Sequence, residues 1–271
     1  MNGDVIATAS TTPAAKRPGE DDISDDVDHQ SEAKRRLLSR EVTRFWHDPV
    51  PTARLTRQFF STGCQELARR LLGQHLVRRL CDGTILRCKV VETECYLGAE
   101  DRASHSFNGR RTERNEPMFM DPGTAYVYIA YGVYHCFNIS SEGDGAAVLL
   151  RSAVPLEGID VMRRLRGVRR KDAGHKLKVR DLCNGPSKLC LAMDISKDSL
   201  NKEFLPDSHA LWVERGDQVL APEDIVVSKR VGIESAGRGW ADKPLRFYVK
   251  NCDCVSVRDK SAEVGSLRNP H

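Results

Sequence analysis

The stretch Val90–Tyr96 (VVETECY) decides how this chain is interpreted. Side chains alternate between the two faces of a strand, so Val90, Glu92, Glu94 and Tyr96 are expected to share one face. Acidic residues are poor strand formers. Two of them beside an aromatic ring, in an otherwise apolar strand, indicate a functional site. A solvent-facing strand edge with paired charges would give the same pattern, so this stretch alone leaves both interpretations open.

The surrounding segments predict an antiparallel sheet. Asp82-Gly83 lies between two β-rich runs, 75–80 and 85–96, and is a strong hairpin signal. Tyr131-Gly132 separates a second pair of runs, 124–129 and 133–139. We expect further strands at 146–153, 210–214, 225–231 and 245–249, and helices at 64–72, 157–166 and 186–193. Strands outnumber helices, and hairpins dominate. We therefore expect a single compact α+β domain with an antiparallel, partly barrel-like sheet, surrounding helices and a protruding hairpin.

Charge is distributed unevenly along the 271 residues. The whole chain carries 42 Lys+Arg and 38 Asp+Glu, a net charge of +4. Residues 1–50 hold seven basic and ten acidic residues, so the remainder carries +7. Residues 1–52 are polar and bury too little apolar surface to fold, so we expect a disordered tail. We expect the folded domain at 53–265 and a disordered end at 266–271. Its mildly basic charge favours a polyanionic partner.

Two short basic clusters in the tail, Lys16-Arg17 and Lys34–Arg36, fit a bipartite nuclear localisation signal. Ordinary charge in a disordered tail is the alternative. We expect a nuclear protein, with mitochondria as a second location. The tail is also a candidate contact site for partner proteins, and a monomer is expected.

Several classes of protein are excluded. The longest apolar runs, such as Ala146–Leu150, are far shorter than the ~20 residues of a membrane-spanning helix, so no membrane contact is expected. Nine cysteines without a secretory signal favour reduced thiols over disulfides. The pair Cys252/Cys254 has no second Cys/His pair at zinc-finger spacing, so we expect no metal. No phosphate-binding or dinucleotide-binding glycine motif is present, and we expect no cofactor.

Four of the six tyrosines fall between positions 126 and 134. Tyr131 sits at the expected hairpin tip, where it buries little surface of its own and is available to wedge between stacked bases. Packing over its own hairpin is the alternative. Upstream, the loop 109–115 (GRRTERN) is polar and basic, which suits phosphate contacts or a merely solvated loop.

Taken together, these stretches resemble the alkyladenine (3-methyladenine, or N-methylpurine) DNA glycosylase family. The resemblance spans roughly residues 53–260. The matching residues are 91–98 (VETECYLG), 103–106 (ASHS), 114–115 (RN), 118–120 (MFM), 122–123 (PG), 126–128 (YVY), 131–132 (YG), 138–140 (NIS), 143–145 (GDG), 148–151 (VLLR), 185–189 (GPSKL) and 243–248 (KPLRFY). One departure is Phe107-Asn108, which stands where the family has a basic residue followed by glycine.

The resemblance implies a base-excision-repair enzyme that flips damaged purines out of double-stranded DNA and hydrolyses the N-glycosidic bond. It makes residues 53–265 the catalytic domain. By this resemblance Glu94 is the general base that activates a water, and Arg151 helps to hold that water. Glu94 acting as a nucleophile is a less favoured alternative.

The family resemblance also assigns the residues that bind DNA. Tyr96, His105 and Tyr128 would enclose the flipped base, and Asn138 would exclude guanine by clashing with its amino group. Tyr131 would fill the gap that the base leaves. We expect backbone contacts from three cations: Arg110, Arg111 and Lys188.

Two other functions remain open from the sequence. A non-catalytic lesion-sensing protein would keep the tyrosines and basic loops but would need no carboxylate. A bifunctional glycosylase-lyase would need an amine in the pocket. The sequence has no lysine between Lys89 and Lys171, a stretch that holds most of the expected pocket residues.

Overall fold

The computed structural model describes residues 53–217 and 219–265, which lie within one compact unit, Val50–His271. The predictions made for 1–52 and 266–271, including the localisation signal, concern segments outside the described residues. Within the described ranges, no helix is long and apolar enough to span a membrane.

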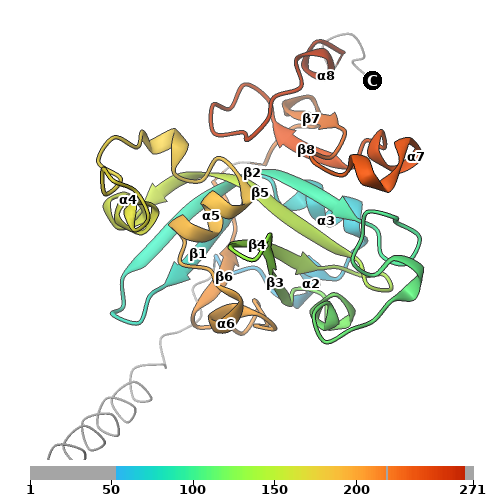
Figure 1. The fold of residues 1–271 in the computed structure, drawn as a ribbon, viewed down its shortest axis with the longest axis horizontal. Coiled ribbons are helices and arrows are strands. Elements are labelled where there is room, and N and C mark those ends of the chain that lie inside the picture. Colours follow the sequence, from blue (N-terminus) through green and yellow to red (C-terminus); the bar gives the residue numbers. More distant parts are fainter. Residues whose placement is uncertain (1–52, 218, 266–271) are drawn as a thin grey trace, which may run out of the picture. The chain divides into compact units, whose positions relative to one another are not determined.

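A curled antiparallel sheet carries the fold (Figure 1). Its strands are β1 (His75–Arg79), β2 (Ile85–Tyr96), β3 (Ala125–Ala130), β4 (Tyr134–Ser140), β5 (Ala147–Glu157), β6 (Leu211–Glu214), β7 (Ile225–Ser228) and β8 (Arg246–Val249). They run in the order β3-β4-β5-β2-β1-β6, while β8 pairs with both β2 and β7. Each of these strand pairs is antiparallel, which confirms the predicted α+β class.

Strand β2 is central, because it pairs with β1, β5 and β8. Thr93 and Cys95 face helix α3 (Cys64–Leu71), since their side chains donate to the carbonyl oxygens of Ala68 and Cys64. The carboxylates of Glu92 and Glu94 therefore project to the other face. The predicted alternation does not extend unbroken to Val90, because the β2–β5 register shifts between Val90 and Glu92.

Helices cover both faces of the sheet. Helix α3 buries Leu67 and Leu71 completely, as their spacing predicts, and packs on β2. Helix α5 (Pro186–Ala192) packs on β4 and β5 from the other side. The remaining α-helices of the described residues are α2 (Arg57–Phe60), α4 (Ile159–Gly167), α6 (Lys197–Leu200), α7 (Arg238–Ala241) and α8 (Lys260–Gly265).

Three predicted boundaries differ from the structure by more than one residue, and one of them is the end of the strand expected at 146–153, which continues to Glu157. The strand expected at 225–231 ends at Ser228, because the chain then leaves the sheet and Arg230 turns inward to pair with Asp101. The helix expected from Glu157 begins at Ile159. Glu157 still belongs to β5, where it bonds Arg87, and Gly158 breaks the strand with φ 76°.

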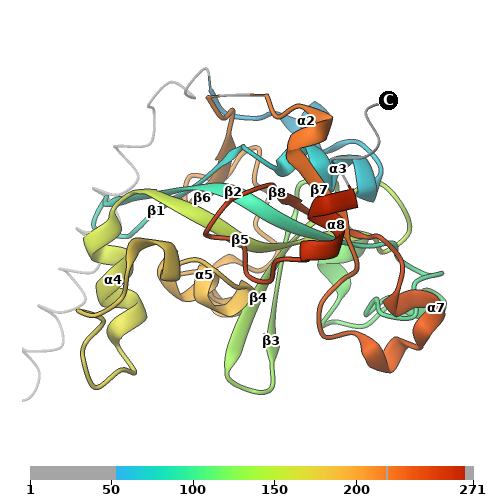
Figure 2. The same ribbon diagram turned by 90° about the horizontal axis from the view of Figure 1, so that it is seen from above.

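The β3–β4 hairpin projects away from the sheet, as predicted (Figure 2). Its turn is closed by a bond from the Val133 amide to the Ala130 carbonyl. Both central residues have positive φ, 51° at Tyr131 and 71° at Gly132. Asn and Gly favour such turns, so a bulky tyrosine at the first position costs backbone energy. Tyr131 is 94% exposed, so packing of its side chain compensates little of this backbone energy.

Replacing Tyr131 by Asn should therefore stabilise the domain, by about 1 kcal/mol at most, because asparagine tolerates the left-handed conformation. Urea unfolding of the two proteins measures the difference. Tyr131→Val is the matched control and should destabilise, since β-branched residues fit poorly at positive φ. Equal stability of the Tyr131→Asn and Tyr131→Val proteins would show that the turn stores no strain.

Candidate active site

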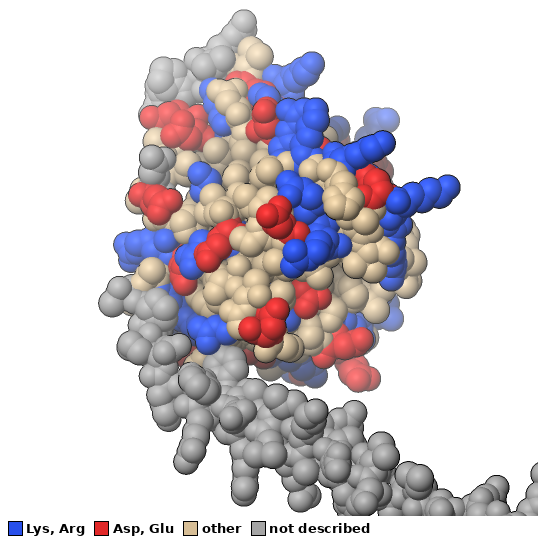
Figure 3. All heavy atoms as spheres, turned by 90° about the vertical axis from the view of Figure 1, so that its left-hand side faces the viewer, with Lys and Arg blue, Asp and Glu red and all other residues tan. Residues whose placement is uncertain are grey.

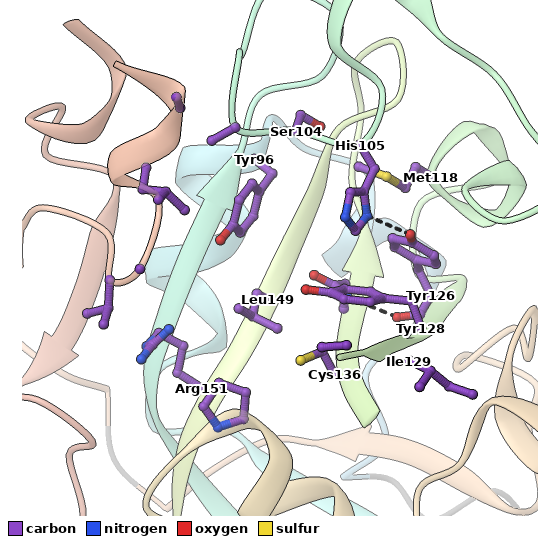
Figure 4. Close-up of a pocket in the computed structure, with 18 of the residues that line it drawn as sticks. Tyr96, Ser104, His105, Met118, Tyr126, Tyr128, Ile129, Cys136, Leu149 and Arg151 are labelled. Atoms are coloured by element: carbon purple, nitrogen blue, oxygen red, sulfur yellow. Dashed lines mark hydrogen bonds between the residues drawn. The ribbon is translucent and has the colours of Figure 1, made fainter. Parts of the chain in front are cut away.

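A cavity of about 810 Å³ lies between the β3–β4 hairpin, the end of β2, the 102–105 loop and the segment 231–236 (Figure 4). The structure brings together on its walls all four residues expected to contact a flipped base: Tyr96, His105, Tyr128 and Asn138. Tyr131, expected to fill the vacated space, and Arg151, expected to hold the water, also line it. Met118 and Cys136 also line it, and neither was assigned a role from the sequence.

Aromatic rings form two opposing walls. Tyr96 stands on one side of the open space, and His105 and Tyr128 stand on the other (Figure 4). The His105 and Tyr128 rings are close to perpendicular, with centroids 4.7 Å apart. The guanidinium of Arg114 lies 5.3 Å from the Tyr128 ring centroid. A flat, electron-poor ligand fits such a space, because aromatic faces attract positive charge.

His105 is neutral at physiological pH. The cavity walls around it, and secondarily the Arg114 cation, lower its pKa to about 4, although the ring is open to the cavity. Burial raises the pKa of Tyr126 to about 12, so its hydroxyl keeps its proton. His105 Nδ1 lies 2.8 Å from the Tyr126 hydroxyl oxygen, and the other ring nitrogen of His105 is turned away from Tyr126 (Figure 4).

Polar residues fix the loop that carries His105. The side-chain amide nitrogen of Asn115 donates to the His105 carbonyl at 2.9 Å and to the Arg110 carbonyl at 2.8 Å. The Ser106 hydroxyl donates to the carbonyl of Gly145 at 2.6 Å. The loop therefore holds the ring in place without help from a ligand. This explains the Ser106 and Asn115 positions in the matching motifs.

Glu94 lies just beneath the cavity and is fully buried. Its carboxylate accepts hydrogen bonds from the Val231 amide at 2.7 Å and the Tyr96 hydroxyl at 3.1 Å. Nη1 of Arg151 lies 3.2 Å away. Burial raises the pKa of Glu94, and Arg151 and the Val231 amide oppose this only in part. All three contacting residues line the cavity, so one layer of side chains separates the carboxylate from the cavity.

Glu92 is equally buried but is saturated with partners. It accepts bonds from Arg151 Nε at 3.0 Å, Arg246 Nη1 at 2.9 Å, the Ser152 hydroxyl at 3.0 Å, and the amide and hydroxyl of Ser256 at 2.7 and 2.9 Å. Burial alone would raise its pKa, but Arg151 and Ser256 outweigh that effect and lower it. Because both carboxylates are fully buried, the alternative interpretation of this stretch as a solvent-facing strand edge is wrong.

A second buried ion pair was not predicted from the sequence. Arg230 donates to Asp101 at 2.9 Å through Nη2 and to the Cys95 carbonyl at 2.8 Å through Nη1, and both charged side chains are wholly buried. The Arg230 guanidinium also lies 4.8 Å from the Tyr96 ring centroid. The pair therefore places the Arg230 guanidinium against the Tyr96 ring. It also holds the neighbouring residue Val231 where its amide donates to Glu94. Nothing local in the sequence marks Arg230 or Asp101 as partners.

The three cations expected at the DNA backbone lie outside the cavity lining. Arg110 is exposed and lies two positions after Asn108, which adopts a left-handed φ of 56°. Arg111 is paired with Glu116 through two bonds of 3.0 and 2.6 Å. Lys188 is exposed in the first turn of α5 and donates to Asn184.

Further cations surround α4 and the loop that follows it. Figure 3 shows Lys and Arg side chains gathered along one edge of the face that carries α4. The exposed basic residues of this segment are Arg164, Arg169, Arg170, Lys171, Lys176 and Lys178. Of these, Arg170 is engaged by Asp172 at 2.8 Å.

Replacing Glu92 by Gln should cost about 3 kcal/mol or more of unfolding free energy at neutral pH, because Arg151 and Arg246 would lose a buried counter-charge. The lowered pKa of Glu92 means that this stability is present above pH ~4 and is lost as the pH falls further. Urea unfolding at several pH values measures it. Glu66→Gln, at an exposed position of α3, is the control. A loss that did not shrink in acid would contradict the ionised state.

Comparison with known proteins places the chain in a family. A family model described as methylpurine-DNA glycosylase matches residues 58–253. A DNA-3-methyladenine glycosylase of Mus musculus is 49% identical over 244 residues, which cover 88% of this chain and 73% of the mouse protein. A protein of the same name from Homo sapiens is 54% identical over 217 residues, covering 79% of this chain and 72% of its own length. The chain therefore belongs to the methylpurine-DNA glycosylase family.

Proposed function

We propose that this chain is a monofunctional base-excision-repair glycosylase, with 53–265 as its catalytic domain. It flips alkylated or deaminated purines out of double-stranded DNA and hydrolyses the N-glycosidic bond, leaving an abasic site. The observation that best supports this proposal is the buried carboxylate of Glu94, which has a raised pKa and is held by Arg151 beneath a cavity with aromatic walls. Relatives named DNA-3-methyladenine glycosylase support the activity.

The flipped base binds between Tyr96 and the pair His105 and Tyr128. Alkylated purines that carry positive charge gain most from these faces, through stacking and cation–π attraction. With the Tyr126 hydroxyl donating to Nδ1, the neutral His105 ring carries its hydrogen on the other nitrogen, which then donates to an acceptor on the base edge.

Asn138 discriminates against normal guanine. Its side-chain amide nitrogen donates to the Tyr126 carbonyl at 3.1 Å, and the residue is buried while lining the cavity. An anchored, buried amide cannot turn aside for the exocyclic amino group of guanine. Rejection by a fixed steric and polar clash does not require the protein to move.

Hydrolysis uses a water held between the sugar and the site formed by Glu94 and Arg151. Glu94 takes a proton from the water as its oxygen bonds to the sugar carbon C1′. The bond between C1′ and the base nitrogen breaks, and its electron pair leaves with the base. A cationic alkylated base departs as a neutral molecule, so no acid is assigned. The reaction uses neither a metal nor a cofactor.

The position of Glu94 favours this role over covalent catalysis. Its oxygens are occupied by Val231, Tyr96 and Arg151, and it does not itself line the cavity. Such a carboxylate reaches the sugar more readily through a water than directly. A lyase would need an amine in the pocket, and the lining residues of the described cavity include no lysine. A purely sensing protein would not need a carboxylate with a raised pKa beside the cavity.

Tyr131 fills the space of the extruded base, because it is almost wholly exposed at the tip of the projecting hairpin. Arg110, Arg111 and Lys188 contact the phosphate backbone, with the cations around α4 adding long-range attraction. Arg111 must exchange Glu116 for a phosphate to do so. We assign the activity to a monomer in the nucleus, with mitochondria as a second location and the tail 1–52 as a contact for repair proteins.

Replacing Glu94 by Gln should lower the single-turnover excision of 1,N6-ethenoadenine or hypoxanthine by about 10²- to 10⁴-fold, because glutamine cannot accept the proton. Binding to the lesion duplex should remain close to that of the unchanged protein. Single-turnover reactions quenched at set times measure the excision rate, and gel-shift titration measures binding to the duplex. Glu66→Gln, on exposed α3 surface, serves as the control. Undiminished excision would remove Glu94 as the base, and binding without excision by the unchanged protein would favour a lesion sensor.

A further inference from the structure

Two cysteines meet in the turn that follows β8. The Val255 amide donates to the Cys252 carbonyl at 3.3 Å, which closes a turn around Asp253 and Cys254. Both cysteine side chains belong to one small apolar cluster with Tyr248. Cys254 is only 6% exposed, whereas Cys252 is half-buried and open to solvent. The pair thus combines an accessible thiol with a protected one.

The accessible sulfur is the more nucleophilic of the two. A hydrogen bond from the Cys254 thiol, aided by the Lys89 cation, lowers the pKa of Cys252 to about 6. That bond and burial raise the pKa of Cys254, so it remains a thiol. The negative charge of Asp253 acts against this decrease in the Cys252 pKa, but Arg180 lies 3.7 Å from the Asp253 carboxylate and partly neutralises it. Thiolates, not thiols, react with peroxides.

The other cysteines of the described residues lack this combination. Five of them are buried: Cys64, Cys88, Cys95, Cys183 and Cys190. Cys136 lines the cavity, but burial raises its pKa. Cys81 is exposed in the β1–β2 turn, away from the cluster that holds Cys252 and Cys254. Cys81 therefore provides a matched control.

The turn is tied to the residues proposed to act in catalysis. Ser256, two positions after Cys254, donates its amide to Glu92 at 2.7 Å and accepts a bond from Arg151 Nη2 at 3.2 Å. Arg151 in turn contacts Glu94. A change in the turn that shifts Ser256 therefore alters the support of Arg151.

We propose that Cys252 and Cys254 form a peroxide-sensitive dithiol, and that its oxidation to a disulfide slows excision by displacing Ser256. The Cys252 thiolate attacks one peroxide oxygen, forming a sulfenic acid and releasing hydroxide. The Cys254 thiol then displaces the sulfenic oxygen as water, so one peroxide is reduced as two thiols are oxidised. Two residues span at most ~7 Å, and the turn shortens this toward the Cα separation of a disulfide.

The test treats the full chain with hydrogen peroxide, alkylates the remaining thiols and locates them by peptide mass. The peptide that carries Cys252 and Cys254 should be lighter by two hydrogens and should not be alkylated. This change should appear before Cys81 is oxidised. Cys252→Ser and Cys254→Ser should each prevent the disulfide, while Cys81→Ser should not. Alkylation of both cysteines after peroxide treatment that oxidises Cys81 would overturn the proposal.

The effect on excision rests on the proposed function and is measured separately. Single-turnover excision should fall several-fold on oxidation and return with dithiothreitol, and Cys252→Ser protein should excise normally with or without peroxide. A disulfide that forms while excision stays unchanged would overturn the regulatory part. Failure of the untreated, reduced protein to excise any lesion would instead overturn the proposed function, since disulfide formation is measured without DNA.

Discussion

Arg151 bridges two fully buried carboxylates, and the arrangement beneath the cavity depends on this one guanidinium. Its Nε lies 3.0 Å from Glu92 and its Nη1 lies 3.2 Å from Glu94. Removing charges from water is costly, and such groups persist inside proteins only when each is paired and hydrogen-bonded. Arg246 adds a second cation on the side of Glu92. The resulting network joins β2, β5 and β8 and fixes the floor of the site.

The same network gives two chemically identical residues different states. Glu92 accepts five bonds and has a lowered pKa, so it anchors the cations. Glu94 has fewer donors and a raised pKa, which suits a group that takes up a proton during a reaction. Pairs of carboxyl groups whose surroundings drive their pKa values apart mark acid–base sites in other enzymes. Here the division follows from which neighbours each carboxylate meets.

The sequence predicts what local rules control. The Asp82-Gly83 turn, the Tyr131-Gly132 hairpin and helix α3 follow from turn chemistry and periodicity, and the structure confirms them. The resemblance predicted the aromatic residues that the cavity brings together. Contacts made across the chain were missed. Arg230 lies 129 positions from Asp101, and Val231 lies 137 positions from Glu94. Only the folded sheet reveals such partners, and only it shows that Glu92 and Glu94 are buried.

The pH dependence of a single turnover tests the proposed role of Glu94 most directly. A duplex with a 7-methylated purine is suitable, because its cationic base leaves without being protonated. If Glu94 is the base, the rate constant should rise with pH through one ionisation above the ordinary glutamate value of ~4.3, and the rise should vanish in Glu94→Gln. A rate constant that does not change with pH through this range, or the same rise in both proteins, would contradict the account.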